Sequence, residues 1–196
     1  MTRSNAHSKG FSLVELMVAI TVAAVLVVYA VPNLRNAIRR NNVSNGSNTL
    51  LAAVTYARAE AISRAVNVSI CPTTDGASFS TSSKDYSAGW LIYSYTPGNG
   101  AANTAYDSSS SNNAILRRTG TLKGVAITAK DAKVISFDQQ GQLTSGTTAS
   151  PVFLTCYLDG STPTSTAAVP GAELDLNGSG SITPKQVAAG ASCTPS

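Results

Sequence analysis

The stretch that decides the fold lies near the N-terminus and reads Lys9-Gly10-Phe11-Ser12-Leu13-Val14-Glu15-Leu16-Met17. It opens an apolar run of 21 residues, from Phe11 to Val31, in which Glu15 is the one charged residue. About 20 apolar residues in a helix are enough to cross a membrane. An ionised carboxylate at the bilayer centre costs about 2.5–3.5 kcal/mol. A plain anchor gains nothing from Glu15, so the acid indicates a second role for this helix.

The position of Glu15 indicates a partner for it at Phe11. Glu15 follows Phe11 by four residues, which is about 6 Å along a helix. If the chain were cut between Gly10 and Phe11, the new ammonium group would be close enough to pair with the carboxylate. The pairing would join groups of one chain or, in a packed assembly, of neighbouring chains.

Two other interpretations of the apolar run stay open. A secretory signal peptide has a positive start, an apolar region of about 7–15 residues and a small-residue cleavage site. Val28-Tyr29-Ala30 would serve as such a site, but the run is longer and holds an acid. The other interpretation is a simple transmembrane anchor. Basic residues flank both ends of the run, so the positive-inside rule does not set its orientation.

The segment Gly10-Phe11-Ser12-Leu13-Val14-Glu15, with Pro32 further along, resembles the type IV prepilin signature. The resemblance implies that a prepilin peptidase removes a leader, residues 1–10, by cutting between Gly10 and Phe11 on the cytoplasmic side. Phe11 would become the N-methylated N-terminus. Glu15 would guide helix packing in the filament core, and Pro32 is assigned to assembly with it.

Charge is spread unevenly along the chain, whose formal net charge is +4 at pH 7. From Pro32 to Ala65 there are five Arg and one Glu, whereas from Val66 to Ser196 there are seven Lys or Arg and eight Asp or Glu. The first of these segments is called the stalk and the second the head. The basic residues of the stalk include Arg35, Arg39 and Arg40, which are placed to meet anionic lipid head groups. The head has no net positive field of the kind that attracts nucleic acid.

The composition argues against an enzyme. His7 is the one histidine and lies in the leader, so the processed chain would lack the commonest general base and metal ligand. The sequence has no acid pair, nucleophile elbow or phosphate-binding glycine loop. We therefore expect no cofactor and no metal.

Periodicity predicts that helix continues beyond the apolar run, up to residue 65. Pro32 is expected to kink the helix or start a new one. After a polar stretch, Asn41 to Asn48, one face is formed by Leu50, Val54, Ala57, Ala61 and Ala65. Gly46 lies in the polar stretch and is expected to bend or loosen the helix, because glycine costs about 1 kcal/mol against alanine.

Short strands are predicted from Val66 onward, separated by Gly, Pro or Asp. They are Val66–Ile70, Gly89–Tyr95, Ile115–Arg118, Gly124–Thr128, Lys133–Phe137, Val152–Leu158 and Ala172–Leu176. Residues 97–113 are predicted to form a long surface loop. The predicted fold class is α+β, with a long N-terminal hydrophobic helix packed on a C-terminal antiparallel β-sandwich head.

Four segments resemble the GspH/FimT family in sequence and in order, namely Ala57–Ile62, Val68–Pro72, Gly89–Tyr93 and Phe137–Gly141. This family contains minor pseudopilins of type II secretion and minor pilins of type IV pili. The resemblance reaches to about Gly141. It implies a long N-terminal helix joined to a β-sandwich head, at or near a filament tip.

The three cysteines are Cys71, Cys156 and Cys193, so at most one bridge forms within the chain. Many family members have a second Cys shortly after the one matching Cys71, but residues 73–79 hold none. The sequence alone does not fix the pairing. A Cys156–Cys193 bridge is favoured because it would pin a Pro- and Gly-rich C-terminus, and its loop would contribute on the order of 3–4 kcal/mol. Cys71 is then expected to be a buried thiol.

DNA binding is possible but not favoured. Family members that bind DNA carry a Gly-Arg-x-Arg turn near the C-terminus, and the comparable stretch here, Asn177–Ile182, holds no arginine. Five cations elsewhere are candidates for contact with phosphates. They are Arg117, Arg118, Lys123, Lys130 and Lys133, which are equally well read as solvated positions on strands.

The stretch from Asp175 to Ile182 also follows the ligand spacing of an EF-hand calcium loop. Position twelve is Gln186 rather than Glu, so the bidentate ligand is missing. Pro184 lies where the exit helix would begin. A turn between two strands is therefore the favoured interpretation.

These observations predict a minor pilin-like subunit of a type IV pilus. Its parts would be the leader 1–10, a transmembrane and filament-core helix 11–31, a helix continuation 32–65 and a β-rich head 66–196. Its partners would be other major and minor pilins, the prepilin peptidase and, before assembly, inner-membrane lipid. It would cross the inner membrane once, with a periplasmic head. The alternatives are a pseudopilin of a type II secretion system, a DNA-uptake receptor pilin and an exported adhesin.

Processing is the first testable prediction. Intact-mass spectrometry of protein extracted from membranes should show a chain that begins at Phe11 and carries one added methyl group. Glu15 can pair at Phe11 only if cleavage has created this new amine. An uncut leader, or a mature N-terminus at Val31, would contradict the prepilin interpretation.

Overall fold

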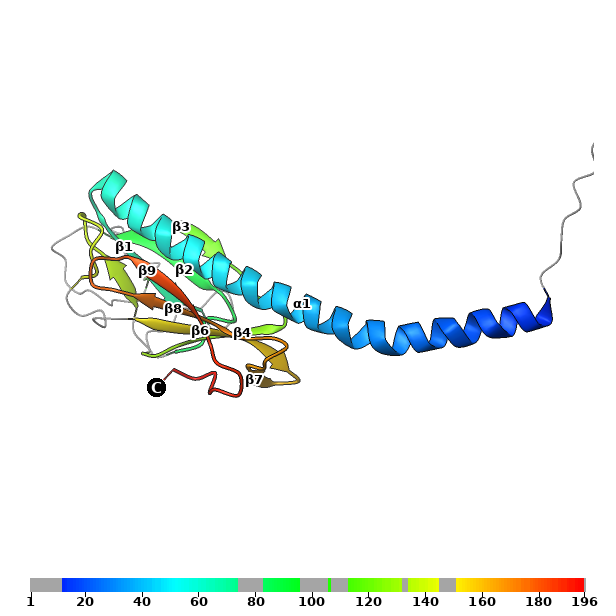
Figure 1. The fold of residues 1–196 in the computed structure, drawn as a ribbon. Helices are drawn as coiled ribbons and strands as arrows, with labels where there is room; N and C mark the ends of the chain where they lie inside the picture. The colour runs from blue at the N-terminus through cyan, green and yellow to red at the C-terminus, as the bar shows by residue number, and fades with distance from the viewer. Residues whose placement is uncertain are drawn as a thin grey trace, which may run out of the picture. The chain divides into compact units, whose positions relative to one another are not determined.

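The computed structural model describes residues 12–73, 83–95, 106, 113–131, 134–144 and 151–195 (Figure 1). In these ranges one helix is followed by nine strands: α1 (Leu13–Arg64), β1 (Asn67–Pro72), β2 (Trp90–Tyr95), β3 (Asn113–Thr119), β4 (Val125–Ala129), β5 (Ile135–Phe137), β6 (Val152–Asp159), β7 (Thr162–Thr164), β8 (Ala172–Leu176) and β9 (Ile182–Gln186). The predicted fold class, a long N-terminal helix followed by antiparallel sheets, is confirmed. Most of the predicted loop 97–113 lies outside the described residues.

The chain divides into two compact units, Met1–Ile38 and Arg39–Ser196. The division falls inside α1, because the helix packs on the sheets only in the second unit. The helix is continuous, and Pro32 lies inside it without ending it. The polar stretch 41–48 is helical as well.

The first unit is an apolar helix that buries almost none of its own surface. Leu13 is 74% exposed and Leu26 is 64% exposed, and the other large apolar side chains up to Val31 are exposed too. Thr21 directs its hydroxyl back to its own helix, donating to the carbonyls of Met17 and Val18 at 3.1 and 2.8 Å. With no polar group left to solvate on that side chain, this segment suits lipid or the apolar side chains of neighbours.

The second unit has two antiparallel sheets against the C-terminal part of α1 (Figure 1). The first sheet has the strand order β3-β2-β1-β5. The second has the order β4-β6-β8-β9, and β7 pairs with β6. Residues of α1 and of both sheets share one core, whose largest buried side chains include Trp90, Tyr86, Phe137 and Phe153.

The helix face that meets this core starts earlier than the periodicity predicts. Val43, Gly46 and Ser47 are buried together with Leu50, Ala53, Val54, Ala57 and Ala61. The prediction that Ala65 belongs to this face is wrong. Ala65 follows the end of α1, has a φ of +51° and is exposed. A residue in the left-handed region just past a helix ends it, so the chain turns there into β1.

Gly46 permits a close approach of α1 to the second sheet. A Cβ atom at this position would lie 3.2 Å from a methyl group of Val125 and 3.3 Å from the methyl group of Thr155. The helix does not end at Gly46, whose loss of helix propensity is offset by packing on β4 and β6. The glycine that the sequence marks as a weak point is a packing position.

Among the described strands, the outer strands β3, β5, β4 and β9 each have a covered or modified edge. Residues 84–87 bond along β4, for example Ala129 N–H to Lys84 C=O at 2.7 Å, and Thr144 N–H donates to Ser136 C=O of β5 at 2.9 Å. The pairing of β2 with β3 contains a bulge, and β3 carries two arginines. On β9, the register with β8 turns the nitrogen of Pro184 to the outside, where a missing N–H costs no ladder bond.

Replacing Gly46 should test the close approach. Gly46→Gln puts a good helix former at this position but forces its side chain against Val125 and Thr155. We expect a loss of about 1–3 kcal/mol in the free energy of unfolding, measured by thermal unfolding of the full chain in detergent micelles. The control is Asn45→Gln at the exposed neighbour, with an expected change within about 0.5 kcal/mol. Equal effects of the two changes would contradict the packing role.

Candidate functional site

Glu15 lies in the first turn of α1, where the helix begins at Leu13. The N-terminal end of a helix carries partial positive charge, so a carboxylate is stabilised there. Glu15 is exposed and surrounded along the helix by exposed apolar side chains such as Leu16 and Val18. Gly10 and Phe11, the predicted cleavage and methylation site, lie outside the described residues.

Arg39 and Arg40 bind the head. Arg39 donates to Asp159 at 3.1 Å, and its guanidinium lies 4.8 Å from the ring centroid of Tyr157. Arg40 donates from Nε to the carbonyl of Ala168. These contacts fix α1 to the second sheet from Arg39 onward, and they occupy two side chains that the sequence also allowed at the lipid surface.

The candidate DNA contacts do not form one cluster. Arg117 pairs with Ile92 in the register of β3 and β2, and Arg118 pairs with Leu91. Cross-strand partners share a face, so the two arginines lie on opposite faces of the sheet. The guanidinium of Arg117 lies 5.7 Å from the ring centroid of Tyr56 on α1.

The three lysines of that set lie elsewhere. Lys123 precedes β4 and Lys130 follows it, so the length of that strand separates them, and both are exposed. Lys133 lies outside the described residues. The described cations are therefore spread over an edge strand and the two ends of another strand.

The stretch from Asp175 to Ile182 forms the hairpin turn between β8 and β9. Asn177 Oδ1 accepts from Ser181 N–H at 2.9 Å and from the Ser179 hydroxyl at 2.7 Å. The Asp175 carboxylate pairs with Lys185 across the hairpin. Its hydrogen bond and its charge raise the pKa of Lys185 above the usual value, so this pair is present at neutral pH and is lost only when the pH rises above the lysine range. Asp175, Asn177 and Ser179, which would be calcium ligands in an EF-hand loop, instead form hydrogen bonds and an ion pair within the hairpin.

The described ranges contain no group of three or more His, Cys, Asp or Glu residues placed to hold a metal ion. Burial, followed by the nearby charge of Cys71, raises the pKa of Tyr86 and of Tyr93 well above the usual tyrosine value. Both phenols stay protonated at neutral pH and belong to the core.

Arg58 joins two turns at one end of the head, and the sequence analysis did not identify this contact. Its Nε donates to Gly141 C=O at 2.9 Å and its guanidinium to Gly180 C=O at 3.3 Å. Leu143 N–H donates to Gly178 C=O at 3.1 Å and links the same turns. Two of the segments that carry the family resemblance, 57–62 and 137–141, therefore meet at Arg58. Gly141 and Gly180 both have positive φ. Glycine at these two positions is the sequence signal for the turns.

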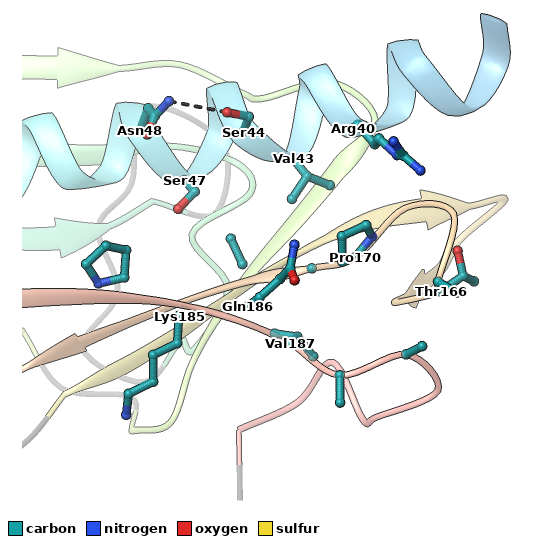
Figure 2. Close-up of a pocket in the computed structure, with 16 residues that line it drawn as sticks. Arg40, Val43, Ser44, Ser47, Asn48, Thr166, Pro170, Lys185, Gln186 and Val187 are labelled. Carbon is teal, nitrogen blue, oxygen red and sulfur yellow. Dashed lines mark hydrogen bonds between the residues drawn. The ribbon is translucent and has the colours of Figure 1, made fainter. Parts of the chain in front are cut away.

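A groove of about 780 Å³ runs between α1 and the start and end of the β8–β9 hairpin (Figure 2). Its helix wall includes Arg40, Ser44 and Asn48, and its other wall includes Pro170 and Gln186. The sixteen residues that line it include no Asp, Glu, His or Cys. Its polar side chains include Lys185 and the hydroxyls of Ser44, Ser47 and Thr166.

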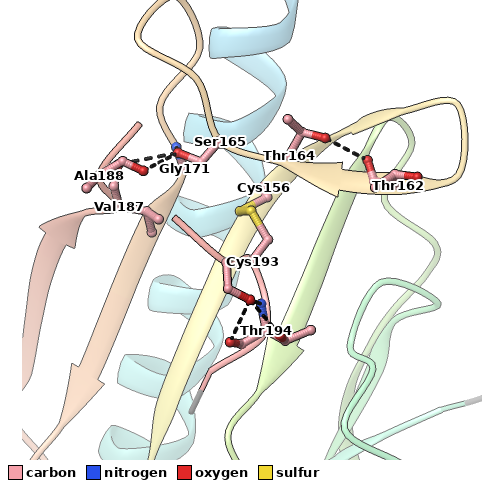
Figure 3. The surroundings of a disulfide bond; sticks show 10 residues. Cys156, Thr162, Thr164, Ser165, Gly171, Val187, Ala188, Cys193 and Thr194 are labelled. Atoms are coloured by element: carbon pink, nitrogen blue, oxygen red, sulfur yellow. Dashed lines mark hydrogen bonds between the residues drawn. A yellow bond between two sulfur atoms is a disulfide. The ribbon is translucent and has the colours of Figure 1, made fainter. Parts of the chain in front are cut away.

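The structure joins Cys156 of β6 to Cys193 near the C-terminus by a disulfide with an S–S distance of 2.11 Å (Figure 3). This is the pair that the sequence analysis favoured. Cys71 is a buried thiol on β1, in the other sheet.

The architecture, an apolar helix with an acid in its first turn followed by a two-sheet head, is that of a type IV pilin. Residues 46–180 match the family described as Type II transport protein GspH, and residues 5–31 match the prokaryotic N-terminal methylation motif. Because the first match covers more than half of the chain, the chain belongs to the GspH family. It is a minor pilin-like subunit. No curated protein matches it.

The fold is similar to the crystal structure of the type IV minor pilin FimU of Pseudomonas aeruginosa PAO1 in space group P21. The two chains are 23% identical, the TM-score is 0.52, and the match covers 74% of this chain and 90% of that chain. For FimU in space group P65, at the same 23% identity, the TM-score is 0.48 and the match covers 72% of this chain and 91% of that chain. The likeness at this identity concerns the fold.

Arg58 offers a test of how the two turns are held. Arg58→Met keeps the length of the side chain but leaves two carbonyls without their donor, which should cost about 1–3 kcal/mol. Arg64→Met is the control, since Arg64 forms an exposed pair with Glu60 worth about 0.3–0.5 kcal/mol. Chemical denaturation of the full chain in micelles measures both. A loss at Arg58 no larger than at Arg64 would show that the turns hold without this contact.

Proposed function

We propose that this chain is a minor subunit of a type IV pilus that assembles through α1 and presents its β head near the filament tip. The observation that carries the proposal is the pairing of two features in one helix. Residues 13–31 expose apolar side chains all round with one acid among them, and the same helix is fixed to the head from Arg39 onward.

The steps before assembly follow from the same helix. Among the described residues, α1 is the one helix long and apolar enough to cross a membrane, with a mean hydropathy of 2.5 over 18 residues. We infer that it crosses the inner membrane once with a periplasmic head and that lipid covers residues 13–31 before assembly. The prepilin peptidase then removes residues 1–10, and Phe11 receives the methyl group. Other major and minor pilins replace lipid in the filament.

The second candidate is a pseudopilin of a type II secretion system, the machine that the printed family description names. Both roles use the same helix and the same processing, and they differ in the machine that receives the subunit. Genes of minor pilins or of a secretion operon beside this gene would separate them. A DNA-uptake receptor is less favoured, because the described cations are dispersed, and we expect no catalytic activity.

Glu15 is the residue to change. Glu15→Leu should leave membrane insertion and leader cleavage intact, because the change makes the helix more apolar. Incorporation should fall at least about tenfold, since a charge pair of about 1.4 kcal/mol or more is lost at each contact. Immunoblotting of sheared filaments against the membrane fraction measures the ratio.

The matched control is Thr21→Val, which removes another polar side chain from the same apolar segment. Thr21 bonds only to carbonyls of its own helix in the structure, so this variant should enter filaments normally. Normal incorporation of Glu15→Leu would refute the role of the acid. Equal losses for both variants would assign the effect to the apolar segment in general.

A further inference from the structure

The last segment of the chain, residues 187–195, follows β9 and is here called the strap. Its first half is tied firmly to the second sheet. Val187 N–H donates to Gly171 C=O at 2.9 Å, and Gly190 N–H donates to Ser165 C=O at 2.9 Å. The buried Ser165 hydroxyl bonds to Ala188 C=O at 3.1 Å and accepts from Gly171 N–H at 3.0 Å (Figure 3).

The second half of the strap is tied differently. The hydrogen bonds recorded for residues 191–195 stay inside the strap, from Ala191 N–H to Ala188 C=O and between Ser192 and Thr194. Cys193 is the one residue buried in this half. A groove of about 670 Å³, lined by Leu154, Glu173 and Pro195 among others, separates the strap from the outer face of the sheet. Among the described contacts, the disulfide is thus the tie that holds this half down.

The two bridged cysteines differ in what would hold them once the bridge is open. Cys156 lies on β6, between β4 and β8, and is 1% exposed. A Cβ atom at Gly171 would lie 2.9 Å from its sulfur and 3.2 Å from Cβ of Val187. Gly171 and Val187 are joined by a backbone hydrogen bond that does not involve the disulfide. The Cys156 sulfur is therefore expected to stay shielded in the reduced protein, whereas Cys193 leaves with residues 191–195.

We propose that Cys193 is the entry thiol for formation of this disulfide, and that its partner is a small or protein disulfide that acts by exchange. The Cys193 thiolate attacks one sulfur of the partner disulfide, whose S–S bond breaks as a mixed disulfide forms and one partner thiolate leaves. The strap then closes, and the Cys156 thiolate attacks the Cys193 sulfur and displaces the second partner thiolate. Cys156 and Cys193 together lose two electrons and two protons, and the partner disulfide gains them as two thiols.

Burial keeps Cys71 out of the exchange. Cys71 is 0% exposed and lies on β1, in the sheet that does not contain Cys156. Once the sheets have formed, neither the partner nor the strap reaches it. The strap thus closes on a head that is already folded.

The test uses the full chain in detergent micelles, reduced and freed of reductant, with oxidised glutathione as the probe. In Cys156→Ala only Cys193 of the pair is left, and in Cys193→Ala only Cys156 is left. Because exchange rates depend on access to the thiol, Cys193 should be glutathionylated at least about tenfold faster than Cys156. Peptide mass mapping distinguishes both from Cys71.

Two further measurements keep the comparison decisive. In strong denaturant the two rates should agree within about threefold, since only folding separates the thiols. If either variant does not fold, a short glutathione pulse on reduced wild-type protein, quenched with acid, should place the mixed disulfide on Cys193. Equal rates in the folded variants, or a mixed disulfide on Cys156, would overturn the proposal.

Discussion

The head depends on the close contact between α1 and two sheets at once. Residues of the helix and of both sheets form one shared core, so neither sheet is covered by the other sheet alone. The helix achieves this contact with a face made largely of small residues, from Gly46 to Ala61. Backbones approach closely where side chains are short, so the larger side chains of the strands, such as Phe137 and Phe153, fill the core.

The joint between stalk and head depends on the same contact. Arg39 binds β6 and Arg40 binds the segment between β7 and β8, at the point where packing of the helix begins. N-terminal to this point, the side chains of α1 have no core to join and remain exposed. One continuous helix thus serves two environments, and the change between them falls at residue 39 rather than at Pro32.

Much of this architecture follows from the sequence because its signals are local. The strand Ala172–Leu176 is predicted with its observed bounds, and the apolar run of α1 needs only hydropathy. The short strand β7 is missed, since Thr162–Thr164 is too short to show a period. The polar stretch around Gly46 is misjudged because its packing partners, Val125 and Thr155, are distant in sequence.

The residues of the candidate site also divide into those with a local sequence signal and those whose contacts are distant in sequence. The motif around Glu15 can be read directly, whereas the contact of Arg58 with two glycine carbonyls cannot. That contact joins residues separated by 83 and 122 positions. Arg117 and Arg118 show the opposite error, since adjacent residues of a strand look like a cluster in sequence but face opposite ways.

The covered and modified strand edges affect how closely packed heads interact with one another. Subunits of a filament stand side by side, so each head meets its neighbours at an effective concentration in the millimolar range. Open strand edges at such concentrations would pair with one another and join heads in arbitrary registers. With Pro184 on β9, a bulge and two arginines on β3, and short segments along β4 and β5, such pairing is disfavoured. The spacing of subunits is then left to their helices, and the heads can differ in sequence without disturbing the order of the polymer.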